Sequence, residues 1–195
     1  PNPNTNIKNG WWHMVLNPNT NATPETLAKI GKIIGGNREN CRKDIENADI
    51  LVYTFGVAPC FFDHEGKFFL AKGSRIGLQR LADEYEFRMT SVEENVENIL
   101  AIIDAVHALR PDIHIVLSLS PVPLALTFEQ KSAVLADCLS KSTLRVAIES
   151  VCREAGDGVY YWPSFKIVRW LGAYVGGMCG AEDGTTSHIS EGIIS

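Results

Sequence analysis

Three short apolar runs, separated by long segments of helical pattern, constrain the fold of this chain more than any other feature. The runs cover residues 50–57, 113–119 and 159–162, and they are rich in β-branched and aromatic residues. Strands that are apolar on both faces are typical of parallel sheets covered by helices on both sides. Because strand–helix–strand connections are almost always right-handed, the sequence predicts an α/β fold with a mostly parallel sheet between layers of helices.

Helical segments are predicted between these runs. The clearest covers residues 91–110, where Ser91 and Glu94 form a capping box and apolar residues recur at steps of three and four. Another covers residues 129–153, in which the polar stretch Ser140-Lys141-Ser142 allows a break. These helices would lie on the faces of the sheet.

Glycine residues indicate where helices end and where the chain turns on both sides of the first run. Residues 25–34 and 39–47 are predicted as two helices, because Gly35-Gly36 between them is typical of a helix end. Residues 60–70 are predicted as a β-hairpin that turns at an Asp-His-Glu-Gly stretch. His64 is interpreted as a turn residue of that hairpin.

Length and composition bound the remaining possibilities. A chain of 195 residues that is 45% hydrophobic can bury one substantial core, so we expect a single domain over residues 1–195. The net charge of −5 does not favour a nucleic-acid or anionic-membrane partner. No apolar segment is long enough to span a bilayer, and the polar start lacks a signal-peptide pattern. The five cysteines include no C-x-x-C pair, so we expect reduced thiols, no metal or other cofactor, and a cytoplasmic protein.

A polar loop near the end of the chain carries candidate catalytic groups. Asp183 and His188 lie five residues apart in the stretch Asp-Gly-Thr-Thr-Ser-His. An imidazole is the usual general base near neutral pH, and a carboxylate that orients its second nitrogen raises its basicity. The pair is chemically sufficient to activate a hydroxyl nucleophile, although the same composition is typical of a solvated turn.

Other candidates follow the apolar runs, because ligands of open α/β sheets bind at the carboxyl ends of the strands. Gly56 lies at the end of the first run, and Ser120 follows the second run ahead of prolines that stiffen the loop. The amide-rich segment at residues 17–21 contains Asn17 and Asn19. Their side chains are typical of turns but could also donate to an oxyanion.

Six short stretches, taken in order, resemble the GSCFA family, and the resemblance spans about residues 45–190. That family is part of the broad SGNH/GDSL hydrolase-like group. The resemblance implies a three-layer α/β/α, flavodoxin-like fold and an enzyme that cleaves or transfers acyl esters, often on carbohydrates, without a cofactor. The stretches are Thr54-Phe55-Gly56, Phe87 to Glu94, Ser120-Pro121-Val122-Pro123, Ser140-Lys141-Ser142 with Leu144-Arg145, Tyr161-Trp162-Pro163-Ser164-Phe165, and Asp183 to His188.

The resemblance also implies roles for single residues. His188 is similar in position to the group's general base and Asp183 to its orienting carboxylate, although the group usually places the aspartate three residues before the histidine. Gly56 falls where the group has its third block, but the asparagine that commonly donates to the oxyanion is replaced by valine and alanine. Oxyanion donors are therefore expected from backbone N–H groups or from Asn17 and Asn19.

The nucleophile is the largest departure from the family pattern. The family is named for a Gly-Ser-Cys-Phe-Ala stretch that carries the serine just after the first strand, and no such stretch occurs in these residues. We expect either a fragment that lacks its N-terminal strand and nucleophile block or a catalytically altered relative. Ser118 and Ser120, and less readily Cys60, are the candidate replacements.

Two functions are consistent with these features. The first is a serine-dependent acyl-ester hydrolase or acyltransferase that acts on an acylated sugar or polysaccharide, with His188 as general base. Its expected partner is a small-molecule or glycan ester substrate. The alternative is a non-catalytic glycan-binding or interaction domain. For that alternative, aromatic side chains would stack on sugar rings, although aromatic residues at such spacings more often form core. These residues are Trp11, Trp12, Tyr160, Tyr161, Trp162 and Trp170.

Overall fold

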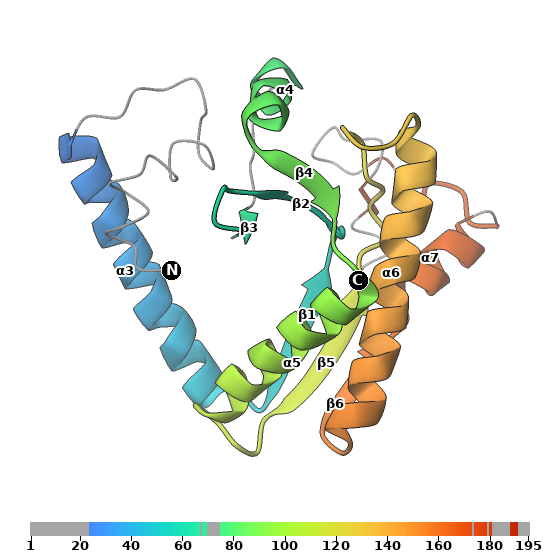
Figure 1. The fold of residues 1–195 in the computed structure, drawn as a ribbon. Coiled ribbons are helices and arrows are strands. Elements are labelled where there is room, and N and C mark those ends of the chain that lie inside the picture. Colours follow the sequence, from blue (N-terminus) through green and yellow to red (C-terminus); the bar gives the residue numbers. More distant parts are fainter. Residues whose placement is uncertain are drawn as a thin grey trace. The chain divides into compact units, whose positions relative to one another are not determined.

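The structure is a computed structural model that describes residues 24–66, 68–69, 75–172, 174–178, 180 and 188–190. Contacts within the chain divide it into two compact units (Figure 1). The first unit consists of Pro1–Asn47 and Pro59–Met89, and the second of Ala48–Ala58 and Thr90–Ser195. The expectation of one domain over residues 1–195 stays a prediction.

The second unit contains a three-stranded parallel sheet with the strand order β1-β5-β6. Its pairing runs from Ile50↔His114 to Phe55↔Leu119 between β1 and β5, and from Ile115↔Val159 to Ser118↔Trp162 between β5 and β6. The strands are β1 (Ile50–Phe55), β5 (His114–Leu119) and β6 (Val159–Trp162). The predicted α/β class with a mostly parallel sheet is therefore confirmed, and the three apolar runs are its strands.

Helices cover this sheet on opposite faces. The helices are α5 (Val92–His107), α6 (Ala133–Ala155) and α7 (Ser164–Leu171). On one face, the guanidinium of Arg145 in α6 lies 4.1 Å from the ring centre of Tyr161. On the other face, Ser164 of α7 hydrogen-bonds Ser118. Ser118 pairs in the sheet with Trp162, which directly follows Tyr161. Because successive strand residues face opposite sides, the arrangement is consistent with three layers.

The core of the second unit lies between the sheet and the helices α5 and α6. Alternate residues of β5 are almost completely buried, with exposed fractions of 1% for Ile115, 1% for Leu117 and 0% for Leu119. The two helices contribute the apolar side chains Ile99, Ile103, Val106, Leu144, Ile148 and Val151. This alternation along β5 defines which face of the sheet carries the hydrophobic core.

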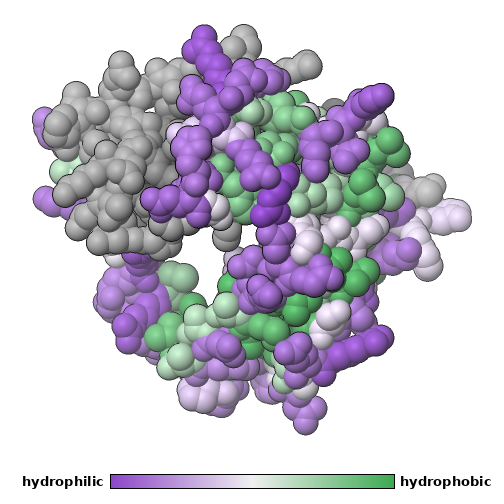
Figure 2. Space-filling view, in the orientation of Figure 1, coloured by the Kyte–Doolittle hydropathy of each residue, from purple (hydrophilic) through white to green (hydrophobic). Residues whose placement is uncertain are grey.

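The outer strand β1 is less buried than its sequence predicts. Ile50 and Val52 share one face of the strand, and their side chains are 58% and 62% exposed. The prediction of burial on both faces is wrong for β1, because within the described residues this face stays open to solvent. On the other face, Leu51 and Phe55 are half-buried. In the lower half of the space-filling view, hydrophobic surface is bordered by hydrophilic residues (Figure 2).

The helices of the second unit follow the predicted signals with one exception. The capping box of α5 is present, because Ser91 Oγ accepts the N–H of Glu94 at 3.1 Å and Glu94 Oε2 accepts the N–H of Ser91 at 2.7 Å. The break allowed in α6 is absent. Ser140 and Lys141 are instead 0% and 3% exposed within a continuous helix, because their polar atoms find partners inside the fold.

The first unit contains a long helix and an antiparallel sheet with the order β3-β2-β4. Its elements are α3 (Pro24–Asn47), β2 (Pro59–Phe62), β3 (Phe68–Phe69), α4 (Arg75–Glu84) and β4 (Glu86–Met89). The predicted hairpin is confirmed as β2 and β3. Its turn places the N–H of Gly66 3.0 Å from the carbonyl of Asp63, and Gly66 has a φ of 75°. His64 lies in this turn and stacks on Tyr85.

Helix α3 replaces the two helices expected near the start of the chain. It continues through Gly35-Gly36, and neither glycine has the positive φ of a helix C-terminus. Glycine permits a helix end but does not impose one, and this explains the wrong prediction. Within the described ranges, none of the helices combines the length and the apolar composition needed to cross a lipid bilayer.

Candidate active site

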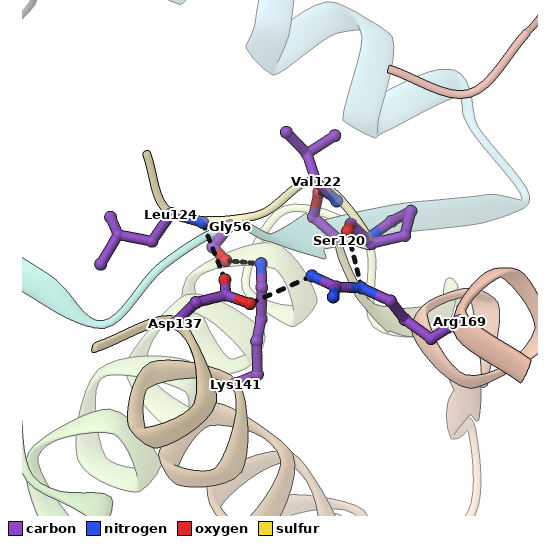
Figure 3. Close-up of polar contacts among 8 residues, drawn as sticks. Gly56, Ser120, Val122, Leu124, Asp137, Lys141 and Arg169 are labelled. Carbon is purple, nitrogen blue, oxygen red and sulfur yellow. Dashed lines mark hydrogen bonds and ion pairs between the residues drawn. The ribbon is translucent and has the colours of Figure 1, made fainter. Parts of the chain in front are cut away.

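The loop Gly56-Val57-Ala58 leaves β1 at the carboxyl end of the parallel sheet, and two neighbouring residues of α6 hold it. Lys141 Nζ donates to the carbonyl oxygen of Gly56 at 2.6 Å, as Figure 3 shows. Ser140 Oγ accepts the N–H of Ala58 at 2.8 Å. Thr90 Oγ1 adds a third bond by donating to the carbonyl oxygen of Ala58 at 2.8 Å. The loop is therefore held on both sides of Val57.

The backbone N–H groups of Gly56 and Val57 have no hydrogen-bond partner in the described part of the chain. Both residues are exposed. Backbone N–H groups in a fixed loop bind carbonyl and anionic oxygens well, because they need no reorganisation when the charge develops. Gly56, which the sequence indicated as an oxyanion or substrate residue, therefore lies in a loop with two available donors.

An ion pair lies beside this loop and joins α6 to α7. Arg169 Nη2 is 3.0 Å from Asp137 Oδ2, and the same arginine donates from Nε to the carbonyl oxygen of Pro121 at 3.3 Å. Asp137 Oδ1 accepts the N–H of Leu124 at 2.7 Å (Figure 3). These bonds join the segment after β5 to both helices. They restrain a loop that its two closely spaced prolines already stiffen.

Lys141 lies one helical turn after Asp137, and its environment is unusual for a lysine. Burial, the largest cause, lowers the pKa of its ammonium group below the ordinary 10.5, the charge of Asp137 acts to raise it, and the charge of Arg169 lowers it. Desolvation disfavours the charged form, whereas the neutral amine still has N–H donors. The side chain can therefore donate to the carbonyl oxygen of Gly56 in either protonation state.

The two candidate serines differ in their surroundings. Ser118 is 2% exposed, and its Oγ donates to the carbonyl oxygen of Trp162 at 3.1 Å and lies 2.7 Å from Ser164 Oγ. Ser164 Oγ in turn donates to the carbonyl oxygen of Leu119 at 2.9 Å. Ser120 Oγ is half-buried and accepts the N–H of Val122 at 3.2 Å. The contacts of Ser118 are those of a residue that joins α7 to the sheet.

His188 lies in a short paired segment near the end of the described chain. Its carbonyl oxygen accepts the N–H of Gly180 at 3.1 Å, and Ser190 N–H donates to the carbonyl oxygen of Met178 at 3.1 Å. Ser190 Oγ adds a bond of 2.8 Å to the carbonyl oxygen of Gly177. These bonds fix the backbone around His188, whose side chain is exposed.

Three other candidates, Asp183, Asn17 and Asn19, lie outside the described residues. The Asp–His pair and the amide donors therefore stay predictions. Cys60 belongs to β2 of the first unit, where it pairs with Arg88 across the sheet. Among the residues that the structure describes, no cluster of three or more His, Cys, Asp or Glu side chains is arranged to hold a metal ion.

Sequence reasoning missed Asp137, Lys141 and Arg169. A signal for the first two was present, because Asp137, Ser140 and Lys141 continue at steps of three and four the same helix face that later carries Leu144 and Ile148. Polar residues on the buried face of an amphipathic helix require partners inside the protein. Those partners lie far along the chain, so the sequence pattern does not reveal them.

The fold and this cluster define an α/β protein with a polar, donor-lined loop at the carboxyl ends of its parallel strands. The chain belongs to the GSCFA family, whose family model matches residues 3–175. No curated protein and no solved structure matches the chain. The match confirms the resemblance to this family, while the relationship to SGNH/GDSL hydrolases stays a prediction.

Proposed function

We propose that the protein is a serine-dependent acyl-ester hydrolase or acyltransferase of the SGNH/GDSL type that acts on an acylated sugar or polysaccharide in the cytoplasm. The observation that carries the proposal is the held loop at Gly56 and Val57, with two N–H groups that have no partner within the described residues. Acyl transfer needs such donors to stabilise the tetrahedral oxyanion. Membership of the GSCFA family supports the same chemistry through the resemblance of its motifs.

In the proposed reaction, His188 removes the proton of a serine hydroxyl as the serine oxygen attacks the ester carbonyl. The N–H groups of Gly56 and Val57 donate hydrogen bonds to the developing oxyanion. His188 then returns the proton to the leaving alkoxide, and an acyl-enzyme remains. Water in a hydrolase, or a sugar hydroxyl in a transferase, attacks the acyl-enzyme and frees the serine. Asp183 orients the imidazole, and Ser120 and Asn17 contact the substrate.

The serine is proposed to come from a strand that pairs with the free edge of β1. Within the described sheet, β1 pairs only with β5, so its second edge has strand-type donors and acceptors to offer. A parallel strand on that edge would end beside Gly56, because the carboxyl ends of parallel strands meet at the same edge of a sheet. The hydroxyl of a residue following that strand would therefore lie close to the oxyanion donors.

Turnover of p-nitrophenyl acetate by the protein expressed from its complete gene tests this function. We expect His188→Ala to lower kcat/KM by roughly 10³-fold or more, because the general base is lost. His114→Ala is the matched control, since His114 is exposed at the opposite, amino-terminal end of β5. Unchanged turnover in His188→Ala would contradict the assignment of the base.

A fluorophosphonate probe and peptide mapping identify the reactive serine. Labelling within a Gly-Ser-Cys-Phe-Ala stretch would support the proposed source of the nucleophile. Labelling of Ser118 or Ser120 would show that the described sheet supplies it instead. If the wild-type protein neither reacts with the probe nor hydrolyses esters, the enzymatic function is refuted.

The alternative function, a glycan-binding domain, is favoured by exposed aromatic residues. Tyr160 and Trp162 point to the same side of β6 and are 51% and 56% exposed, and Trp170 of α7 is 64% exposed. Aromatic faces of this kind stack on sugar rings. Calorimetric titration with oligosaccharides should then show binding that Trp162→Ala weakens and His188→Ala leaves unchanged.

A further inference from the structure

We propose that Lys141 and Ser140 are positioning residues that orient the Val57 N–H toward the reacting oxyanion, an inference that rests on the proposed function. Neither side chain would touch the substrate. Each acts through one peptide group of the Gly56-Val57-Ala58 loop. Their neighbours Asp137 and Arg169 form an ion pair that joins α6 to α7, and Asp137 also bonds the N–H of Leu124 in the loop after β5 (Figure 3).

The peptide group between Gly56 and Val57 determines the direction of the Val57 N–H. The carbonyl of Gly56 and the N–H of Val57 belong to one planar trans peptide unit, so they point in opposite directions. Lys141 Nζ lies 2.6 Å from that carbonyl oxygen. Because Lys141 holds the carbonyl toward α6, the N–H of Val57 must point away from α6.

Ser140 fixes the next peptide group. The N–H of Ala58 donates to Ser140 Oγ at 2.8 Å, and this N–H shares a peptide plane with the carbonyl of Val57. The two side chains therefore hold both peptide planes that flank the Cα atom of Val57. Thr90 holds the third plane through the carbonyl of Ala58. A loop with successive planes fixed in this way cannot flip the Val57 N–H without breaking the bond from Lys141 to Gly56.

The bond from Lys141 also affects how strongly the Val57 N–H donates. A donor on the carbonyl oxygen polarises the amide and strengthens the hydrogen bond that its N–H makes. Lys141 is 3% exposed, so water does not screen this contact as it would at the surface. Burying a lysine costs free energy, and its hydrogen bond with Gly56 offsets part of that cost.

Lys141→Met tests the positioning role, because methionine has a similar length and no donor. With p-nitrophenyl acetate we expect kcat to fall roughly 10- to 100-fold while KM changes less than about twofold, since the contact acts on the oxyanion. The affinity for a trifluoromethyl ketone, which forms a tetrahedral adduct, should fall by the same factor as kcat/KM. Lys43→Met, which removes an exposed lysine of α3 in the first unit, is the control and should leave both values unchanged.

A second measurement does not require turnover. Backbone ¹⁵N relaxation of the Val57 amide, and hydrogen exchange of the Ala58 amide, report on the loop itself. We expect Lys141→Met to lower the order parameter of Val57, and Ser140→Ala to speed exchange of the Ala58 amide more than about tenfold. Ser140→Thr should restore slow exchange, because it keeps the acceptor. Amides of β5 should be unaffected in both variants.

The outcomes separate the positioning role from the function. Reduced order at Val57 with a matched loss of turnover and of analogue affinity supports both. If Lys141→Met lowers the order of Val57 but the wild-type protein hydrolyses no ester, the orienting contact is supported and the enzymatic function on which the proposal rests is refuted. Unchanged order at Val57, or a loss of turnover without any loss of analogue affinity, overturns the positioning role.

Discussion

Asp137 of α6 and Arg169 of α7 form an ion pair at 3.0 Å, and the same carboxylate accepts the N–H of Leu124. Asp137 is 9% exposed, so its two acceptors lie largely away from water. We expect Asp137→Ala to lower the free energy of unfolding by about 1–3 kcal/mol, because it leaves the half-buried N–H of Leu124 without this acceptor and removes the partner of Arg169, whose own partial exposure limits the loss. Urea unfolding measures the change.

Asp137→Asn tests which bond matters. Asparagine keeps an acceptor for the N–H of Leu124 but loses the charge, so we expect about half the loss of the alanine variant. The control is Glu39→Ala in α3, which removes an exposed pair with Lys43 and should not shift the urea midpoint. Equal losses in the alanine and asparagine variants would show that the charge alone is responsible.

Ser118 is expected to have a structural role and not a catalytic one. Ser118→Ala removes the hydroxyl that joins β5 to the start of α7 through Ser164 and should lower the free energy of unfolding by about 1 kcal/mol. Ester turnover should persist, because the hydroxyl bonds the carbonyl oxygen of Trp162 and the hydroxyl of the half-buried Ser164. Thermal unfolding and turnover are measured together, with the exposed Ser142→Ala in α6 as the control. Loss of turnover with unchanged stability would reverse this assignment.

The capping box of α5 gives a prediction that is independent of function. Ser91→Ala should lower the free energy of unfolding by about 1 kcal/mol, since the N–H of Glu94 loses its acceptor at the helix start. Ser91→Asp keeps an acceptor and should retain most of the stability. Ser150→Ala in α6 is the matched control, because its hydroxyl only bonds back to the carbonyl of Val146. Chemical denaturation of the three variants compares them directly.

The buried ammonium group of Lys141 should make stability depend on pH. Its pKa is lower in the folded chain than the ordinary 10.5, chiefly through burial, so the unfolded chain binds more protons between those two values. The contribution of Lys141 to the free energy of unfolding therefore rises as pH increases through this window. We expect the difference in unfolding free energy between Lys141→Met and the wild type to shift in favour of the wild type as pH rises from about 7 to about 10. A difference that is constant with pH would show that the lysine is not desolvated.

The two faces of the sheet should respond differently to truncation. Leu117 is 1% exposed in the centre of the core, and its replacement by alanine should lower the free energy of unfolding by about 2–5 kcal/mol. Val52 is 62% exposed on β1, and Val52→Ala should change stability by less than about 0.5 kcal/mol. Urea unfolding of both variants is the measurement. A large loss in Val52→Ala would indicate that another segment covers this face.

Features that depend on neighbouring residues were predicted well from the sequence. The capping box at Ser91 uses atoms three residues apart, and the hairpin after β2 turns within a few residues, so local geometry decides both. The three strands were also predicted, because a continuous apolar run has few other stable arrangements. Helix α3 shows the limit of this reasoning, since Gly35-Gly36 permits both a helix end and a continuous helix.

Features that depend on distant partners were not predicted. Ser140 and Lys141 looked like a polar break in a helix, yet their partners are the backbone of residues 56–58, more than eighty positions earlier. The position of β1 at the outside of the sheet likewise depends on which strands pair. Of the candidate site, Gly56 and Ser120 were placed at strand ends as expected, while the roles of His188 and Asp183 stay predictions.

The amino-acid sequence by itself determined the α/β class, the strands and the capped helix, because hydrophobic periodicity and capping act over a few residues. Only the tertiary structure decided that Lys141 reaches the carbonyl of Gly56 and leaves the Val57 N–H without a partner in the described chain. A buried polar group takes whichever partner the packed fold brings within hydrogen-bond distance. That choice depends on how helices and strands far apart in sequence come together.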